Sequence, residues 1–179
     1  MKFSIGYNHD IKFLELLDSY KEHIEALYFP IPGQYLGSGR GSSIQPGIYL
    51  KEIPFLIKKC KTLGIKPQLL LNATCAGRVA LSKPFINNII NYVRGLKRLG
   101  LKSVIVTNPV YIHEIKSSIG NIEVESSVNC YVRTAQHALY LKDLGVDVIT
   151  VDADINRDIP LIKEIKAKTG LKIRILLND

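Results

Sequence analysis

The feature that most constrains this fold is a short junction that recurs four times along the chain. At each junction a helical pattern ends in a glycine, and the apolar residue after it opens a β-rich run. The four junctions are Leu63-Gly64-Ile65-Lys66, Leu99-Gly100-Leu101-Lys102, Leu144-Gly145-Val146-Asp147 and Thr169-Gly170-Leu171-Lys172. Glycine readily takes the left-handed conformation that ends many helices. The repetition therefore predicts successive βαβ units.

The β-rich runs are short and mostly apolar on both faces, as in Val104-Ile105-Val106. We expect strands at about 2–8, 24–30, 67–73, 103–108, 122–129, 146–152 and 172–178. Helical patterns lie between them at about 11–22, 50–63, 84–99, 110–118, 133–144 and 157–168. Strands that are buried on both faces are typical of a parallel sheet covered by helices.

Right-handed crossovers between such units lead either to an open doubly wound sheet or to a (β/α) barrel. The first turn, Tyr7-Asn8-His9-Asp10, lacks the glycine fingerprint of many doubly wound sheets. The uniform repeat favours an α/β fold with a parallel, TIM-like barrel. A complete barrel takes typically ~250 residues, whereas this chain has 179. We expect residues 1–179 to form one incomplete barrel domain of about seven strands and six helices, either part of a longer protein or completed by another subunit in a homo- or hetero-oligomer.

The net charge of +8 is concentrated in one block of the chain. Residues 51–102 carry 11 basic side chains and one acidic side chain. The block is also rich in Ile, Leu and Val, which excludes a disordered basic tail. Its charges fall mainly on predicted helices, so we expect a solvated or partner-facing flank, with RNA binding as an alternative.

The remaining composition excludes several classes of protein. The longest apolar runs are too short to span a membrane. Cys60, Cys75 and Cys130 form neither a C-x-x-C pair nor an even-numbered framework, which indicates a reducing, cytoplasmic location. They are also too scattered to make a metal site by themselves, so we expect no metal or cofactor held within this chain. The sequence contains no zinc-protease motif, nucleophile elbow or recognisable catalytic triad.

Ligand sites of parallel barrels lie at the carboxyl ends of the strands. Most of the predicted strands end in a carboxamide or a carboxylate, namely Asn8, Asn72, Asn108, Asn129, Asp152 and Asn178. A ring of such groups predicts a site for a polar, hydroxylated or carboxylated ligand. The alternative is that these residues only cap helices and form turns, as Asn108 followed by Pro109 suggests.

Loops at the same edge add candidate charged groups. In the longest connection, residues 31–49, three glycines alternate around Arg40, and amides beside a guanidinium could cradle a phosphate or carboxylate. A lid without anion chemistry is the other interpretation of this loop. Arg78, after the third strand, is a second candidate anion ligand. Asp154, after the sixth, is either an acid–base group or a helix cap.

The segment from Glu123 to Ile165 resembles the collagenase-like peptidase family, the U32 peptidases. The features that carry the resemblance are a strand leading to Asn129, a helix from about Arg133, the Leu144-Gly145 junction and the turn Asp154-Ile155-Asn156. The resemblance implies an N-terminal (β/α) barrel. Some members are assigned as proteases, and others are implicated in hydroxylation of RNA bases or quinone precursors with prephenate as oxygen donor. The hydroxylase members carry an iron–sulfur cluster on cysteines after the seventh strand, so a cluster is expected only if the protein continues past Asp179.

Together these observations predict a barrel domain that binds an anionic small molecule or RNA, without a membrane. The candidate binding residues are Arg40, Asn72, Arg78, Asn108 and Asn129, and the candidate catalytic residues are Asp154 and Asn129. The reaction expected from the resemblance is prephenate-dependent hydroxylation or peptide hydrolysis. The alternatives are a non-catalytic partner or RNA-binding module, and an unrelated barrel enzyme that acts on a phosphorylated small molecule.

Overall fold

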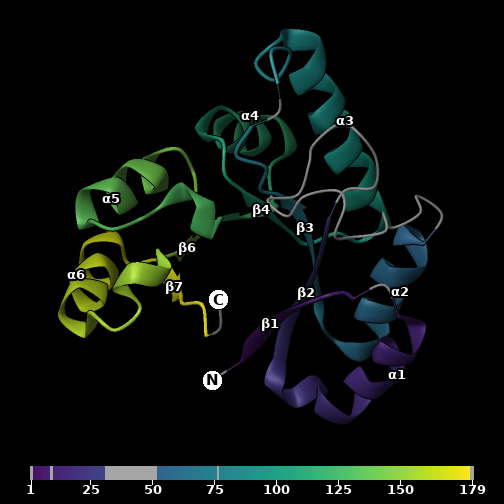
Figure 1. The fold of residues 1–179 in the computed structure, drawn as a ribbon. Helices are drawn as coiled ribbons and strands as arrows, with labels where there is room; N and C mark the ends of the chain where they lie inside the picture. The colour runs from purple at the N-terminus through teal and green to yellow at the C-terminus, as the bar shows by residue number, and fades with distance from the viewer. Residues whose placement is uncertain (1, 9, 31–51, 76, 178–179) are drawn as a thin grey trace. The chain divides into compact units, whose positions relative to one another are not determined.

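The computed structural model describes residues 2–8, 10–30, 52–75 and 77–177 as strands that alternate with helices (Figure 1). The strands are β1 (Phe3–Gly6), β2 (Ile24–Pro30), β3 (Lys66–Leu71), β4 (Ser103–Val106), β5 (Glu123–Ser126), β6 (Val148–Thr150) and β7 (Lys172–Arg174). The α-helices are α1 (Ile11–Tyr20), α2 (Ile53–Leu63), α3 (Lys83–Leu99), α4 (Pro109–Ile119), α5 (Ala135–Asp143) and α6 (Ile159–Thr169). Single 3-10 turns are η1 (Lys21–His23), η2 (Val128–Cys130) and η3 (Ala153–Ile155). Arg40, with the rest of the loop 31–49, and Asn178 lie outside the described residues.

The strand order of the sheet is the order of the chain, β1-β2-β3-β4-β5-β6-β7. The pairs β1–β2, β2–β3, β5–β6 and β6–β7 are parallel. A helix follows each of the first six strands, which is the topology of a (β/α) barrel up to its seventh strand. The predicted fold class, an incomplete TIM-like barrel of seven strands and six helices, is confirmed.

The glycine junctions form as the sequence predicts. Gly64 ends α2 at a φ of +70° and Gly100 ends α3 at a φ of +114°, both in the left-handed region. At the second junction the amide of Leu101 donates to the carbonyl of Leu96 at 3.0 Å. The last carbonyls of the helix are thereby satisfied while the chain turns into the next strand.

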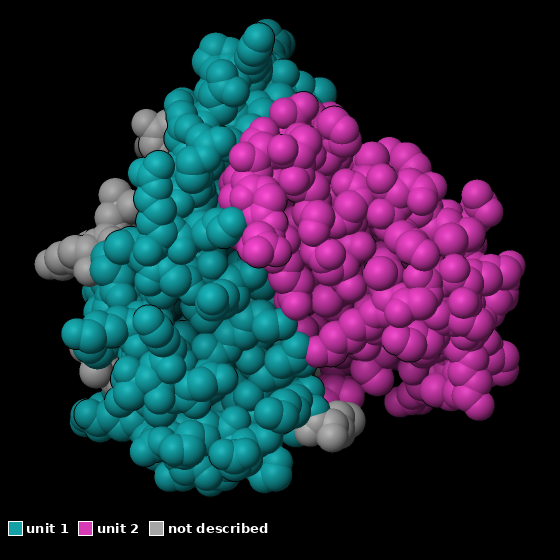
Figure 2. Space-filling view, turned by 180° about the vertical axis from the view of Figure 1, so that it is seen from behind, with its two compact units in different colours: residues 1–104 teal, residues 105–179 magenta. Residues whose placement is uncertain are grey.

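The chain divides into two compact units, residues 1–104 and residues 105–179 (Figure 2). In the first unit Leu27, Phe29, Ile57 and Leu69 are fully buried, and in the second unit Val106, Ile112, Val124 and Ile149 are. Helices α5 and α6 of the second unit lie side by side (Figure 1). No helix in the described ranges is both long and apolar enough to cross a membrane.

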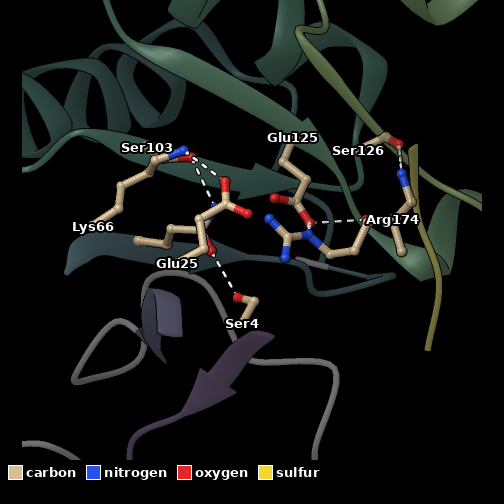
Figure 3. A network of polar contacts seen from close by, with 9 residues as sticks. Ser4, Glu25, Lys66, Ser103, Glu125, Ser126 and Arg174 are labelled. Carbon is tan, nitrogen blue, oxygen red and sulfur yellow. Dashed lines mark hydrogen bonds and ion pairs between the residues drawn. The ribbon is translucent and has the colours of Figure 1, made fainter. Parts of the chain in front are cut away.

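Polar side chains are partly or fully buried between the strands of the first unit, although the sequence predicts strands that are mostly apolar on both faces. The hydroxyl of Ser4 donates to Oε1 of Gln68 at 3.0 Å, and Nε2 of Gln68 donates to Oγ of Ser103 at 3.0 Å. Beside them Nζ of Lys66 lies 3.3 Å from Oε1 of Glu25 (Figure 3). These contacts pair polar groups that burial would otherwise make costly.

The second unit buries an ion pair between β5 and β7 (Figure 3). Nε of Arg174 lies 2.7 Å from Oε1 of Glu125, and only 14% and 2% of the two side chains are exposed. The hydroxyl of Thr150, on the intervening strand β6, donates to the same carboxylate oxygen at 2.9 Å. Three neighbouring strands are thus joined by one buried carboxylate.

Candidate functional site

Hydrogen bonds tie together the carboxyl ends of β4, β5 and β6 in the second unit. The amide of Ser127 donates to the carbonyl of Val106 at 2.9 Å. Sγ of Cys130 lies 3.5 Å from the carbonyl oxygens of Val106 and Thr107. The amide of Asp152 donates to the carbonyl of Val132 at 3.1 Å. The segments that follow these three strands therefore lie along one edge of the unit, where a parallel barrel places its ligand site.

An arginine held by two aspartates lies on this edge. Nε of Arg133 donates to Oδ2 of Asp152 at 2.9 Å, and Nη2 of Arg133 lies 2.6 Å from Oδ2 of Asp154. Asp152 is 4% exposed, and its other carboxylate oxygen accepts from the amide of Asp154 at 2.9 Å. The side chains of Arg133 and Asp154 are 53% and 69% exposed. The guanidinium is thus anchored from the protein side and open to solvent on the other.

The electrostatics keep both Asp152 and Arg133 ionised. Burial alone raises the pKa of Asp152, but the amide of Asp154 and the guanidinium of Arg133 outweigh it and hold that pKa below its ordinary value. The hydrogen bond and the charge of Asp152 raise the pKa of Arg133. Arginine has five N–H donors, and the two carboxylates engage only Nε and Nη2. Within the described residues, no contact of Nη1 with a carboxylate is found.

Three of the candidate site residues predicted from the sequence lie on this edge in the structure. Asp154 is exposed and paired with Arg133. Asn129 lies half-buried in η2, where its amide donates to Oγ of Ser127 at 3.2 Å. Asn108 caps α4, because its Oδ1 accepts from the amide of Val110 at 2.9 Å. The capping role that the sequence suggests for Asn108 is therefore present.

Two other predicted residues, Asn72 and Arg78, belong to the first unit. Asn72 follows β3 directly and is half-buried, and Arg78 is exposed in the next turn.

Strand β5 ends at Ser126 rather than at Asn129, because the hydroxyl of Ser127 accepts from the amide of Asn129 and starts a 3-10 turn. The end of the fifth strand was thus predicted three residues too late.

The sequence pattern does not indicate Arg133 as a site residue, because it predicts that a helix begins at about this position. Helix α5 begins at Ala135, and Oγ1 of Thr134 caps it by accepting from the amide of His137 at 3.1 Å. A residue before an N-cap lies in the preceding loop, which leaves Arg133 free of the helix. The available signal is Thr134, directly after Arg133, because threonine is a favoured N-cap residue.

Within the part of the chain that the structure describes, no set of side chains fits a metal ion or an iron–sulfur cluster. Across the described ranges no three His, Cys, Asp or Glu side chains are grouped as metal ligands would be. Cys60 is buried in α2, Cys75 is exposed after β3, and Cys130 is half-buried in η2. Burial raises the pKa of Cys60 to about 12 and that of Cys130 to about 11, so both thiols stay protonated at neutral pH.

The parallel (β/α) fold and the charged cluster after its strands define a barrel-type domain with polar groups at the edge where such barrels bind ligands. The model of peptidase family U32 matches residues 46–177, and the chain belongs to this family. The resemblance noted from the sequence is confirmed, and the alternative of an unrelated barrel enzyme is removed.

This chain is similar to a curated protein and to several solved structures. Its sequence is 28% identical over 159 residues to "Uncharacterized protease MJ1657" of Methanocaldococcus jannaschii. The aligned residues cover 89% of this chain and 46% of that protein. The chain therefore spans about half the length of this curated relative. The structure of the U32 peptidase Mk0906 matches this chain with a TM-score of 0.76 and 22% sequence identity. The match covers 98% of this chain and 68% of the Mk0906 chain. A glycerophosphodiester phosphodiesterase from Parabacteroides distasonis has a TM-score of 0.67 and 14% identity over 98% of this chain and 84% of its own, a likeness of fold alone.

Proposed function

We propose that this chain is the barrel part of a U32-family enzyme that binds an anionic ligand at the carboxyl edge of its strands, with Arg133 as the main anion contact. The observation that carries the proposal is the guanidinium fixed by buried Asp152 at 2.9 Å while 53% of its side chain faces solvent. A fixed guanidinium loses little conformational entropy when it binds a planar anion. Asn108 and Asn129 are candidate polar contacts on the same edge. Arg40, Asn72 and Arg78 are further candidates from the first half of the chain.

The names of the relatives support a peptide as the ligand. The terminal carboxylate of a peptide is a planar anion that matches a guanidinium fork. Asp154, an exposed carboxylate 2.6 Å from the guanidinium, is the candidate acid–base group, and Asn129 is the candidate group to polarise a carbonyl. Hydroxylation of RNA or of a quinone precursor would depend on cluster ligands from outside these residues, because the three cysteines do not supply them.

The test is a titration of the protein with acetate and with inorganic phosphate, followed by ¹H–¹⁵N NMR. In the wild type we expect shifts that saturate and are largest for residues 127–134 and 152–156. Arg133→Gln should weaken binding about tenfold or more, because hydrogen bonds to a charged group contribute about 1.5–3 kcal/mol. Arg98→Gln, in the last turn of α3, is the matched control and should bind as the wild type does. Unchanged binding by Arg133→Gln would exclude this site.

A second function, RNA binding, is supported by the basic block alone. Lys58, Lys61, Arg98 and Lys102 are exposed within it, and the only acidic residue between 51 and 102 is Glu52. Binding to a tRNA through these charges should fall steeply as salt increases. The variant Lys58→Glu/Lys61→Glu should reduce that binding, whereas Arg133→Gln should not. Affinity that is insensitive to salt would contradict this function.

A further inference from the structure

Tyr131 holds a backbone conformation that is unusual for a bulky residue. Its φ is +51° and its ψ is +50°, in the left-handed region. Among the described residues other than glycine, only Asn121 shares a positive φ, at +50°. Asparagine visits this region readily, whereas a tyrosine there is a conformational outlier. The amide of Tyr131 donates to the carbonyl of Val128 at 2.9 Å, which closes η2 and holds the residue in place.

Packing does not account for the tyrosine side chain. Tyr131 is 59% exposed, whereas Val132 beside it is fully buried. The segment therefore contributes to the core through Val132, and the ring of Tyr131 stays outside. A glycine would fit the backbone at position 131 with less strain and would cost little buried apolar surface. A strained residue with an exposed ring at a strand carboxyl end is an indication of function rather than of folding.

Tyr131 also lies in the same loop as the proposed anion contact, Arg133. Tyr131 and Arg133 are two residues apart in the loop between β5 and α5. The negative charge of an ionised Tyr131 phenolate raises the pKa of Arg133, as the charges of Asp152 and Asp154 do more strongly. An exposed ring thus lies two residues along the loop from a guanidinium that Asp152 holds in one orientation.

We propose that Tyr131 is a ligand-contacting residue that determines the specificity of this site, and that the ligand carries a flat apolar group next to its anionic group. The anion pairs with Arg133 while the flat group packs against the ring of Tyr131. This inference rests on the proposed anion binding at Arg133. Aromatic contacts of this kind are geometrically selective, so they discriminate between anions of equal charge.

The experiment compares three carboxylates of the same charge, namely acetate, cyclohexanecarboxylate and benzoate, by NMR titration. The wild type should bind benzoate about 2- to 12-fold more tightly than acetate, with cyclohexanecarboxylate between them. Tyr131→Gly should bind acetate as the wild type does and lose the preference for benzoate. Tyr131→Asn, which also tolerates a positive φ, should behave in the same way. Asn121→Gly removes the other left-handed non-glycine residue and should keep the preference.

The outcomes separate this inference from the proposed function. Equal binding of acetate and benzoate by the wild type, or a preference that survives in Tyr131→Gly, would overturn the role of Tyr131 while leaving anion binding at Arg133 intact. Failure of all three carboxylates to bind the wild type would overturn both. A urea midpoint for Tyr131→Gly at or above that of the wild type supports the inference, because it shows that the tyrosine is not retained for stability. A large drop in that midpoint would make its role structural.

Discussion

Replacing Arg174 with methionine should strongly destabilise the second unit. Arg174 and Glu125 lie 2.7 Å apart with 14% and 2% of their side chains exposed. Methionine keeps most of the volume of the arginine stem but removes its charge. The carboxylate of Glu125 would then stay buried without the charge of Arg174, while the hydroxyl of Thr150 on β6 still donates to it at 2.9 Å.

The magnitude follows from the burial of the pair. Removing one partner of a buried ion pair typically costs about 3–5 kcal/mol. The retained hydrogen bond from Thr150 and the partial exposure of Arg174 favour the lower end, so we expect a loss of about 3 kcal/mol in the free energy of unfolding. Neutralising the carboxylate as well, in Glu125→Gln/Arg174→Met, should restore most of this loss, because a buried neutral pair carries no uncompensated charge.

Urea unfolding followed by far-ultraviolet circular dichroism measures the effect, since the chain contains no tryptophan. With a slope of about 2 kcal/mol/M, the midpoint of Arg174→Met should fall by about 1.5 M. Arg157→Met, at an exposed position in the same unit, is the control and should change the stability by less than about 0.5 kcal/mol.

Two results would refute this reasoning. One is an Arg174→Met variant as stable as the Arg157→Met control, which would mean that solvent already screens the pair. The other is a double variant that is no more stable than Arg174→Met, since an uncompensated carboxylate would then not be the cause of the loss.

Three further predictions concern single residues. Gly100→Ala should lower the free energy of unfolding by about 1–2 kcal/mol, because it places alanine at a φ of +114°. Gly95→Ala, inside α3 with open space around it, should raise the free energy of unfolding by about 0.4–1 kcal/mol. Thermal unfolding measures both effects. Asp152→Asn should be less stable than the wild type at pH 7, and the difference in stability should shrink as the pH falls below about 4. The reason is that the lowered pKa of Asp152 stabilises the fold only while its carboxylate is ionised. A constant difference in stability down to pH 2 would contradict this. With a thiol-specific disulfide reagent at pH 8, Cys75 should react quickly and the two less accessible cysteines only after unfolding; three fast thiols would contradict the structure.

Local sequence was sufficient to predict the fold class of this protein. The left-handed glycines at 64 and 100 and the cap at Asn108 each depend on contacts within a few residues. Such contacts depend on little beyond the neighbouring residues, so the junctions, and with them the alternation of helices and strands, could be predicted before the structure. The resemblance to the U32 peptidases rested on the same local turns, and the family model confirms it.

Only the tertiary structure decided which charged side chains meet. Arg133 and Asp152 are 19 residues apart and belong to loops that follow different strands, so their contact depends on the pairing of β5 with β6. The ion pair of Glu125 with Arg174 likewise needs β6 between them in parallel register. A periodic pattern indicates that a strand is buried, but it does not show which neighbour will compensate a buried charge. That is why the sequence indicates the edge of the strands as a candidate site but does not single out Arg133, which the structure places there between Asp152 and Asp154.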